Sequence, residues 1–263
     1  MQEIRLYYES LEQGSDYLLP MIREVVTKGT NTKLVKRPKK ANQFQRGALY
    51  SILSFTTPDA LITGINNGIE YPLAIIEFTE AVKTEDHELQ RTYGALASYL
   101  SETFYIKISG HKESEKEFGG AEYNPFSTPK ILIDQFGYEG YIIADWGTNT
   151  GNKFTLQRHS KLPACPPEIP ILKYTIQAAV KSFLISEKKW FENSIMDLKQ
   201  NSVYKTYREE VDKATGAKEL LETWKGRRAT NLNKLRYFVN KDWVGAKINR
   251  LSHAMDPDRG ILN

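Results

Sequence analysis

The chain has 263 residues, of which 40% are hydrophobic and 26% are charged, and its formal net charge is +4. This is ordinary globular composition, and the length suffices for one large domain or for a catalytic domain with a smaller attachment. No apolar run approaches the roughly 18 residues that span a bilayer, and the first residues lack a signal-peptide core. The single cysteine, Cys165, excludes an intramolecular disulfide and a thiolate metal cluster. The sequence therefore predicts a soluble, cytoplasmic protein.

The charges are unevenly distributed along the sequence. Seven Lys or Arg residues and no acidic residue lie between positions 25 and 58, and nine basic residues against three acidic ones lie between 224 and 263. The rest of the chain is therefore net acidic. Charge runs are often only solvated surface, but an acidic part beside basic segments suits a protein that collects cations and meets a polyanion. The distribution favours nucleic acid as the partner.

Hydrophobic pattern and turn residues predict a mixed α/β order in the first part of the chain. The turn Asn66-Asn67-Gly68 is typical of a hairpin, and the apolar run after it is expected in mid-sheet. The expected elements in chain order are a helix at 17–28, a basic arm at 28–46, strands at 47–65 and 71–82, a helix at 86–102, a strand at 104–110, a loop at 111–129, and a strand pair at 130–136 and 140–147 joined at Gly137.

The pattern changes after a proline-rich break at 163–170. Helices are expected at 174–198, 203–226 and 229–251. We therefore expect the α/β (α+β) class, with a mixed central sheet flanked by helices and a largely helical C-terminal region. The expected division is a catalytic core at 1–162, which includes the basic arm, and a helical, basic, DNA-contacting region at 163–263 packed on that core.

Two acidic residues are predicted to meet at one corner of the sheet. Asp59 follows Pro58 on one expected strand, and Glu77 ends the next strand across the hairpin turn. Two close carboxylates repel each other and raise each other's pKa unless a cation lies between them. Mg²⁺ prefers carboxylate oxygens, keeps several waters and accepts phosphate oxygens. Such a metal lowers the pKa of an attacking water and stabilises the leaving group of a phosphodiester.

This arrangement resembles the PD-(D/E)XK nuclease superfamily, which includes most type II restriction endonucleases. The matching segments are Pro58-Asp59, the strand end at 75–79, and the helix that carries Gln90-Arg91-Thr92-Tyr93, so the resemblance covers about 45–110. It implies that Asp59 and Glu77 bind Mg²⁺ and that the chain cleaves double-stranded DNA at specific sequences. Many such enzymes cut palindromes as homodimers, so the resemblance also implies a homodimer.

The superfamily places a lysine two residues after the second acid, and this sequence has Thr79 there. Threonine cannot hold a positive charge, and three interpretations stay open. In the first, Thr79 orients water through its hydroxyl. In the second, a lysine from another position supplies the charge, and Lys83 is preferred to Lys107. In the third, the chain is an inactive nuclease fold that only binds DNA.

Two polar and basic clusters are predicted to contact DNA, although solvated surface is the alternative for both. Lys and Arg neutralise phosphates, and Asn and Gln can contact base edges. The second cluster stands on an expected helix, which could enter the major groove. The first cluster is Lys36, Arg37, Lys39, Lys40, Gln43, Gln45 and Arg46, and the second is Arg227, Arg228, Asn231, Lys234 and Arg236.

Two rival functions share parts of this pattern. A non-catalytic DNA-binding or recognition module would carry the basic clusters and give Asp59 and Glu77 no role. A repair or RNA-processing nuclease of the same superfamily would cut structured substrates without a fixed sequence. Glu24, on the first expected helix, is either an additional acid near the metal or, as we prefer, a solvated side chain. No Walker motif or dinucleotide fingerprint is present, which argues against nucleotide-driven chemistry.

Overall fold

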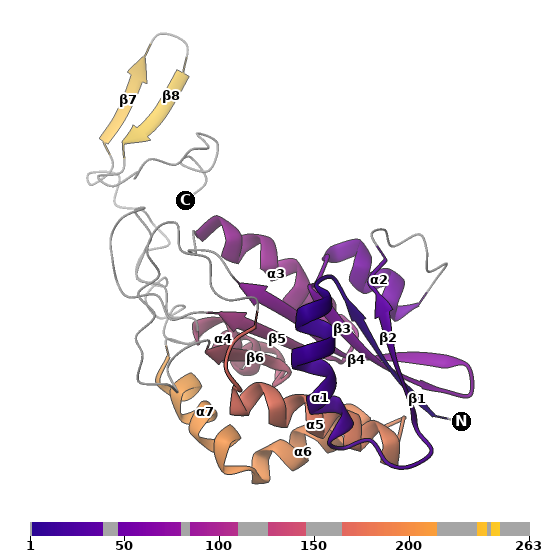
Figure 1. Cartoon of the computed structure of the whole chain (residues 1–263). Helices are drawn as coiled ribbons and strands as arrows, with labels where there is room; N and C mark the ends of the chain where they lie inside the picture. The colour runs from indigo at the N-terminus through magenta and orange to yellow at the C-terminus, as the bar shows by residue number, and fades with distance from the viewer. Residues whose placement is uncertain are drawn as a thin grey trace.

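The central feature of the computed structural model is a six-stranded mixed sheet in the order β2-β1-β3-β4-β5-β6 (Figure 1). The structure describes residues 2–38, 47–79, 85–109, 126–145, 165–214, 236–240 and 243–247. The strands of the sheet are β1 (Glu3–Tyr8), β2 (Asn31–Lys36), β3 (Ala60–Asn66), β4 (Ile69–Thr79), β5 (Phe104–Ser109) and β6 (Tyr141–Asp145).

The strand directions confirm the predicted mixed sheet. β1 runs parallel to β2 and antiparallel to β3, β3 and β4 are antiparallel, and β4, β5 and β6 are parallel. The predicted hairpin lies between β3 and β4, where Asn67 and Gly68 have φ angles of 51° and 78°. Positive φ at both central residues is typical of the type I′ turn, whose twist matches that of the flanking strands.

Helices cover both faces of the sheet (Figure 1). α2 (Ala48–Phe55) and α3 (Glu85–Leu100) lie on one face, and α5 (Pro170–Ile185) lies on the other, where α6 (Trp190–Gln200) and α7 (Ser202–Lys213) pack against it. The π-helix η1 (Glu12–Leu18) continues into α1 (Leu19–Arg23), which contacts α5, and α4 (Ser127–Phe136) contacts β6 and α7.

Two glycines mark the close approach of helix and sheet on these faces. A Cβ atom at Gly64 in β3 would overlap the ring of Phe183 in α5, and a Cβ atom at Gly94 in α3 would lie 2.5 Å from the ring of Tyr105 in β5. Tyr105 therefore projects toward the face that α2 and α3 cover, whereas Gly64 lies under α5. These contacts assign each strand residue to a face, because alternate residues of a strand point to opposite sides.

One continuous hydrophobic cluster connects the sheet to the C-terminal helices. It runs from Ile4 in β1 through Ile75 in β4 to Leu172 and Phe183 in α5 and Val211 in α7. The described helices after residue 164 therefore share the core of the sheet. The boundary at 162 and 163 stays a prediction, because 146–164 lie outside the described residues. Within the described part, no helix combines the length and the apolar character needed to cross a membrane.

Two segments expected as strands are helical. Residues 48–55 form α2, in which Leu49, Ile52 and Leu53 are buried at helical spacing, so the first expected strand begins only at Ala60. The segment 130–136 belongs to α4, which ends at Gly137 in the left-handed conformation with φ 63°. The neighbour of β6 is therefore β5, in parallel, and not the segment before Gly137.

Other expectations were wrong near the two ends of the chain. β1 was not predicted, and residues 31–36 of the expected basic arm form β2. The first helical segment, η1 with α1, begins earlier than expected and ends at Arg23. Instead of the helix expected at 229–251, the described residues form the antiparallel hairpin of β7 (Arg236–Asn240) and β8 (Trp243–Lys247). Its aromatic and β-branched residues, such as Tyr237, Phe238 and Val239, favour strand.

Candidate active site

Asp59 lies at the corner where β3 begins. Its backbone carbonyl accepts a hydrogen bond of 2.8 Å from the amide of Glu9 at the end of β1, which fixes the entry into β3. Its side-chain Oδ2 accepts a hydrogen bond of 2.6 Å from the backbone N–H of Phe78 in β4. The carboxylate is thus oriented toward the neighbouring strand and is half-buried.

Glu77 lies opposite Asp59 on β4. Ala60 pairs with Ile76 in the antiparallel register, so Asp59, one residue before Ala60, lies opposite Glu77, one residue after Ile76. The Glu77 side chain is only 7% exposed, and its Oε1 accepts a hydrogen bond of 3.2 Å from Thr56 Oγ1 at the end of α2. The backbone register thus places these two residues opposite each other at one corner of the sheet.

Lys107 is the register partner of Glu77 on the parallel strand β5, and its side chain is fully buried. Neighbouring positions in register project to the same face of a sheet. Tyr105, two residues earlier, faces α3, so Glu77 and Lys107 both project toward the α2–α3 face. A further acid, Asp145, ends β6 on this same face, since Ile143 pairs with Lys107 and Asp145 follows two residues later.

The two residues that we preferred for the third role are described less fully. Thr79 is the last residue of β4, and its backbone pairs with Ser109 of β5. Lys83 lies outside the described residues. Gln90 belongs to the first half of α3, and Tyr93 is 59% exposed, so Tyr93 is not a core residue.

The basic arm is described only at its beginning. Lys36 Nζ donates to the carbonyl of Glu9 at 2.8 Å, and Arg37 pairs with the Glu9 carboxylate at 2.9 Å, so both side chains connect the ends of β1 and β2. The other predicted contacts, except Arg236, lie outside the described residues: Lys39, Lys40, Gln43, Gln45, Arg46, Arg227, Arg228, Asn231 and Lys234. Arg236 begins strand β7 and does not stand on the helix that we expected.

Glu24 has partners on the other side of the sheet. Its carboxylate pairs with Lys173 Nζ at 3.0 Å and accepts a hydrogen bond of 2.9 Å from Gln177 Nε2, both in α5. These hydrogen bonds hold the pKa of Glu24 below its ordinary value. Because α5 covers the face opposite to Glu77, this contact joins α1 to α5 and adds no acid to the corner of Asp59.

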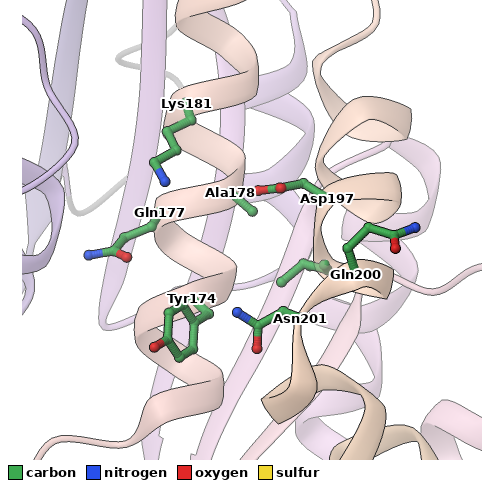
Figure 2. Close-up of a pocket in the computed structure, with 8 residues that line it drawn as sticks. Tyr174, Gln177, Ala178, Lys181, Asp197, Gln200 and Asn201 are labelled. Carbon is green, nitrogen blue, oxygen red and sulfur yellow. The ribbon is translucent and has the colours of Figure 1, made fainter.

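A cleft of about 290 Å³ lies between α5 and the end of α6, with Lys181, Asp197 and Asn201 among its lining residues (Figure 2). In Figure 2, the side chains of Asp197 and Asn201 extend from the α6 side toward α5. None of the residues predicted from the sequence as functional lines this cleft. It belongs to the helical face and is separate from the Asp59–Glu77 corner.

The donor set at the corner fits a hard divalent cation. In the described part of the chain, no group of three or more His, Cys, Asp or Glu side chains is arranged to hold a metal ion. A cation at this corner would take two carboxylates, from Asp59 and Glu77, and water or phosphate would supply its other ligands. This is the coordination that Mg²⁺ commonly adopts, because it gives up its water reluctantly and binds through one or two carboxylates.

Thr56 and Asp145 were not predicted from the sequence as neighbours of the site. Asp145 follows an apolar run, as Glu77 does, and this shared pattern was a usable signal. Thr56 gave no signal, because its role depends on α2 ending beside β4, and we had assigned that segment to a strand.

No protein-family model and no curated protein sequence match the chain. The chain is similar to a solved structure, the pre-specific restriction endonuclease BsaWI in complex with DNA, at 18% sequence identity and a TM-score of 0.31. The likeness covers 54% of this chain and 47% of that one, so it spans about half of that protein. Because a TM-score of this size does not establish a common fold, the functional assignment depends on the geometry of the Asp59–Glu77 corner.

Proposed function

We propose that this chain is a Mg²⁺-dependent endonuclease of the type II restriction class that hydrolyses double-stranded DNA at specific sequences. The observation that carries the proposal is the opposition of Asp59 and Glu77 across the antiparallel pair β3 and β4. Their order along the chain, the hairpin between them and the helix after them are also those of the PD-(D/E)XK resemblance. DNA as the substrate is supported by the basic segments of the sequence.

In this proposal Asp59 and Glu77 hold the metal, and the fold keeps each carboxylate in a defined orientation. The amide of Phe78 holds Asp59, and the hydroxyl of Thr56 holds Glu77. Mg²⁺, when bound, lowers the pKa of the attacking water and stabilises charge on the phosphate. Rigid, pre-oriented ligands lower the reorganisation needed during the reaction.

The remaining assignments are part of the same proposal. Thr79 and Lys83 are candidates for orienting the attacking water and balancing the phosphate charge, and the two basic clusters would clamp the DNA backbone. A homodimer would match the two-fold symmetry of a palindromic site.

The test is the incubation of phage DNA with the purified full chain in Mg²⁺, with Ca²⁺ and EDTA as comparisons. We expect discrete fragments in Mg²⁺ and intact DNA in EDTA. Intact DNA in Mg²⁺ despite tight binding would show a recognition module in place of an enzyme. Continuous degradation without fixed fragments would contradict sequence specificity and favour a repair-type or RNA-processing nuclease.

A further inference from the structure

A fully buried lysine lies beside the candidate metal corner and has no role in the function as proposed so far. Lys107 is 0% exposed, and its Cα is paired with that of Glu77 on the adjacent parallel strand. Adjacent strands are about 4.8 Å apart, and paired positions project to the same face. The four-carbon stem of Lys107 therefore starts next to Glu77 and runs over the face that α3 covers.

The sheet places acidic residues on both sides of this lysine. Glu77 lies on β4, and Asp145 lies on β6, one diagonal step beyond the register partner Ile143. A lysine is rarely fully buried with its charge unless carboxylates compensate it, because an isolated buried ammonium is very costly. Burial of Lys107 between two strands that each carry an acid on the same face thus favours a retained positive charge at this position.

The position of Lys107 also lies near the place where the superfamily has a lysine and this chain has Thr79. Thr79 ends β4 two residues beyond Glu77, and its backbone pairs with Ser109, two residues beyond Lys107. Lys107 therefore stands one strand away from the place where a lysine on β4 would stand, at the same end of the sheet. Functional side chains on strands are held more rigidly than those on loops.

We propose that Lys107 is the cationic catalytic residue of this site, a role that deepens the proposed nuclease function and rests on it. Before metal binding, its ammonium compensates the charge of Glu77. With metal and DNA bound, the ammonium is released from Glu77 and balances the negative charge that develops at the scissile phosphate. Lys107 keeps its proton throughout and forms no covalent bond.

This role predicts opposite effects on metal binding and on cleavage. In Lys107→Met, which removes the charge and keeps the side-chain length, Mg²⁺ affinity should rise about threefold or more, because a repelling cation is removed from the corner. Single-turnover cleavage should fall at least about 100-fold, because the developing charge loses its partner. Calorimetric titration with Mg²⁺ alone and cleavage of a defined duplex give the two readouts.

A relocated lysine tests the role against a merely structural one. The double variant Thr79→Lys with Lys107→Met restores one ammonium at the same end of the sheet, and we expect it to recover at least about tenfold of the lost rate. If Lys107→Met does not fold, Lys107→Arg keeps the charge but not the ammonium geometry. In that variant, a tenfold slower cleavage with unchanged Mg²⁺ affinity supports the role.

The inference is overturned if Lys107→Met cleaves within threefold of the wild type, if its Mg²⁺ affinity is unchanged or lower, or if Lys107→Arg cleaves at the wild-type rate. Failure of the proposed function looks different, because the wild-type chain itself would then leave DNA intact in Mg²⁺. If the wild type cleaves DNA and Lys107→Met is equally active, only the role of the lysine is excluded, and the proposed function stands.

Discussion

At the scale of single residues, the candidate site depends on short contacts that orient two carboxylates. Glu77 is almost completely buried, and the described contact to its Oε1 is the hydroxyl of Thr56 at 3.2 Å. Groups that orient a metal ligand control both its position and its basicity. In the proposed site, Thr56 is therefore a positioning residue for Glu77.

Replacing Thr56 by valine should weaken catalysis without weakening DNA binding. Thr56→Val keeps the shape of the side chain but removes the donor to Glu77, and we expect cleavage to fall by about 10- to 100-fold. DNA affinity in Ca²⁺, measured by fluorescence anisotropy, should stay unchanged. The matched control is Ser54→Ala in α2, whose hydroxyl donates to the carbonyl of Tyr50. Equal loss of activity in both variants would contradict the positioning role.

The local pattern of the sequence points to Asp59 and Glu77, but it does not bring Lys107 next to Glu77. The two acids are separated by one hairpin, so local pattern is enough to bring them together. Lys107 reaches Glu77 only through the parallel pairing of β4 and β5, which requires the whole crossover through α3. Lys83 was preferred because it is near Glu77 in sequence, and sequence distance says little about a parallel sheet.

At the scale of elements, the packing of α3 on β5 forms the wall over the site. Gly94 allows this approach, because the fully buried Tyr105 ring occupies the space that a Cβ would need. The exposed side of the same helix carries Tyr93, Leu96 and Leu100. Small residues such as Gly94, Ala95 and Ala97 face the sheet instead.

Substitution of this glycine should therefore destabilise the protein, although alanine is the better helix former by about 1 kcal/mol. The Cβ of Gly94→Ala would lie 2.5 Å from the Tyr105 ring, and overpacking of this kind costs about 1–3 kcal/mol net. Urea unfolding measures the difference. Leu100→Ala on the same helix, where Leu100 is 62% exposed, should change the free energy of unfolding by less than about 0.5 kcal/mol. A more stable Gly94→Ala would disprove the close packing.

The elements that the sequence predicted well are those with an unambiguous pattern. β4, β5 and β6 are apolar runs rich in β-branched and aromatic residues. α5 to α7 have helical spacing, although α5 and α6 were expected as one helix. α2 and α4 were misassigned because their runs are short and apolar, and in such runs periodicity does not separate strand from helix. β1 and β2 were missed because charged residues such as Glu3, Arg5 and Lys33 alternate along them. Glu3 pairs with Arg5 on its own strand and with Lys33 on the neighbouring strand.

At the scale of the whole molecule, the two faces of the sheet carry different kinds of side chain. The face under α5 continues the hydrophobic core through Phe183 and Leu172. The face under α2 and α3 carries Glu77, Lys107 and Asp145 near the ends of three parallel strands. This arrangement lets the core supply stability while one corner of the sheet collects charged side chains that would otherwise be costly to bury.

We propose above that the metal-dependent cleavage of DNA requires both Asp59 and Glu77. The most direct measurement compares single-turnover cleavage of a duplex by the wild type, Asp59→Ala and Glu77→Ala in Mg²⁺, with DNA affinity measured in parallel. The control is Asp197→Asn, a carboxylate that lines the cleft on the other side of the sheet. We expect both variants to lose cleavage by at least about 100-fold and to keep their affinity for DNA, while the control retains both. Wild-type cleavage in either Asp59→Ala or Glu77→Ala would contradict the account.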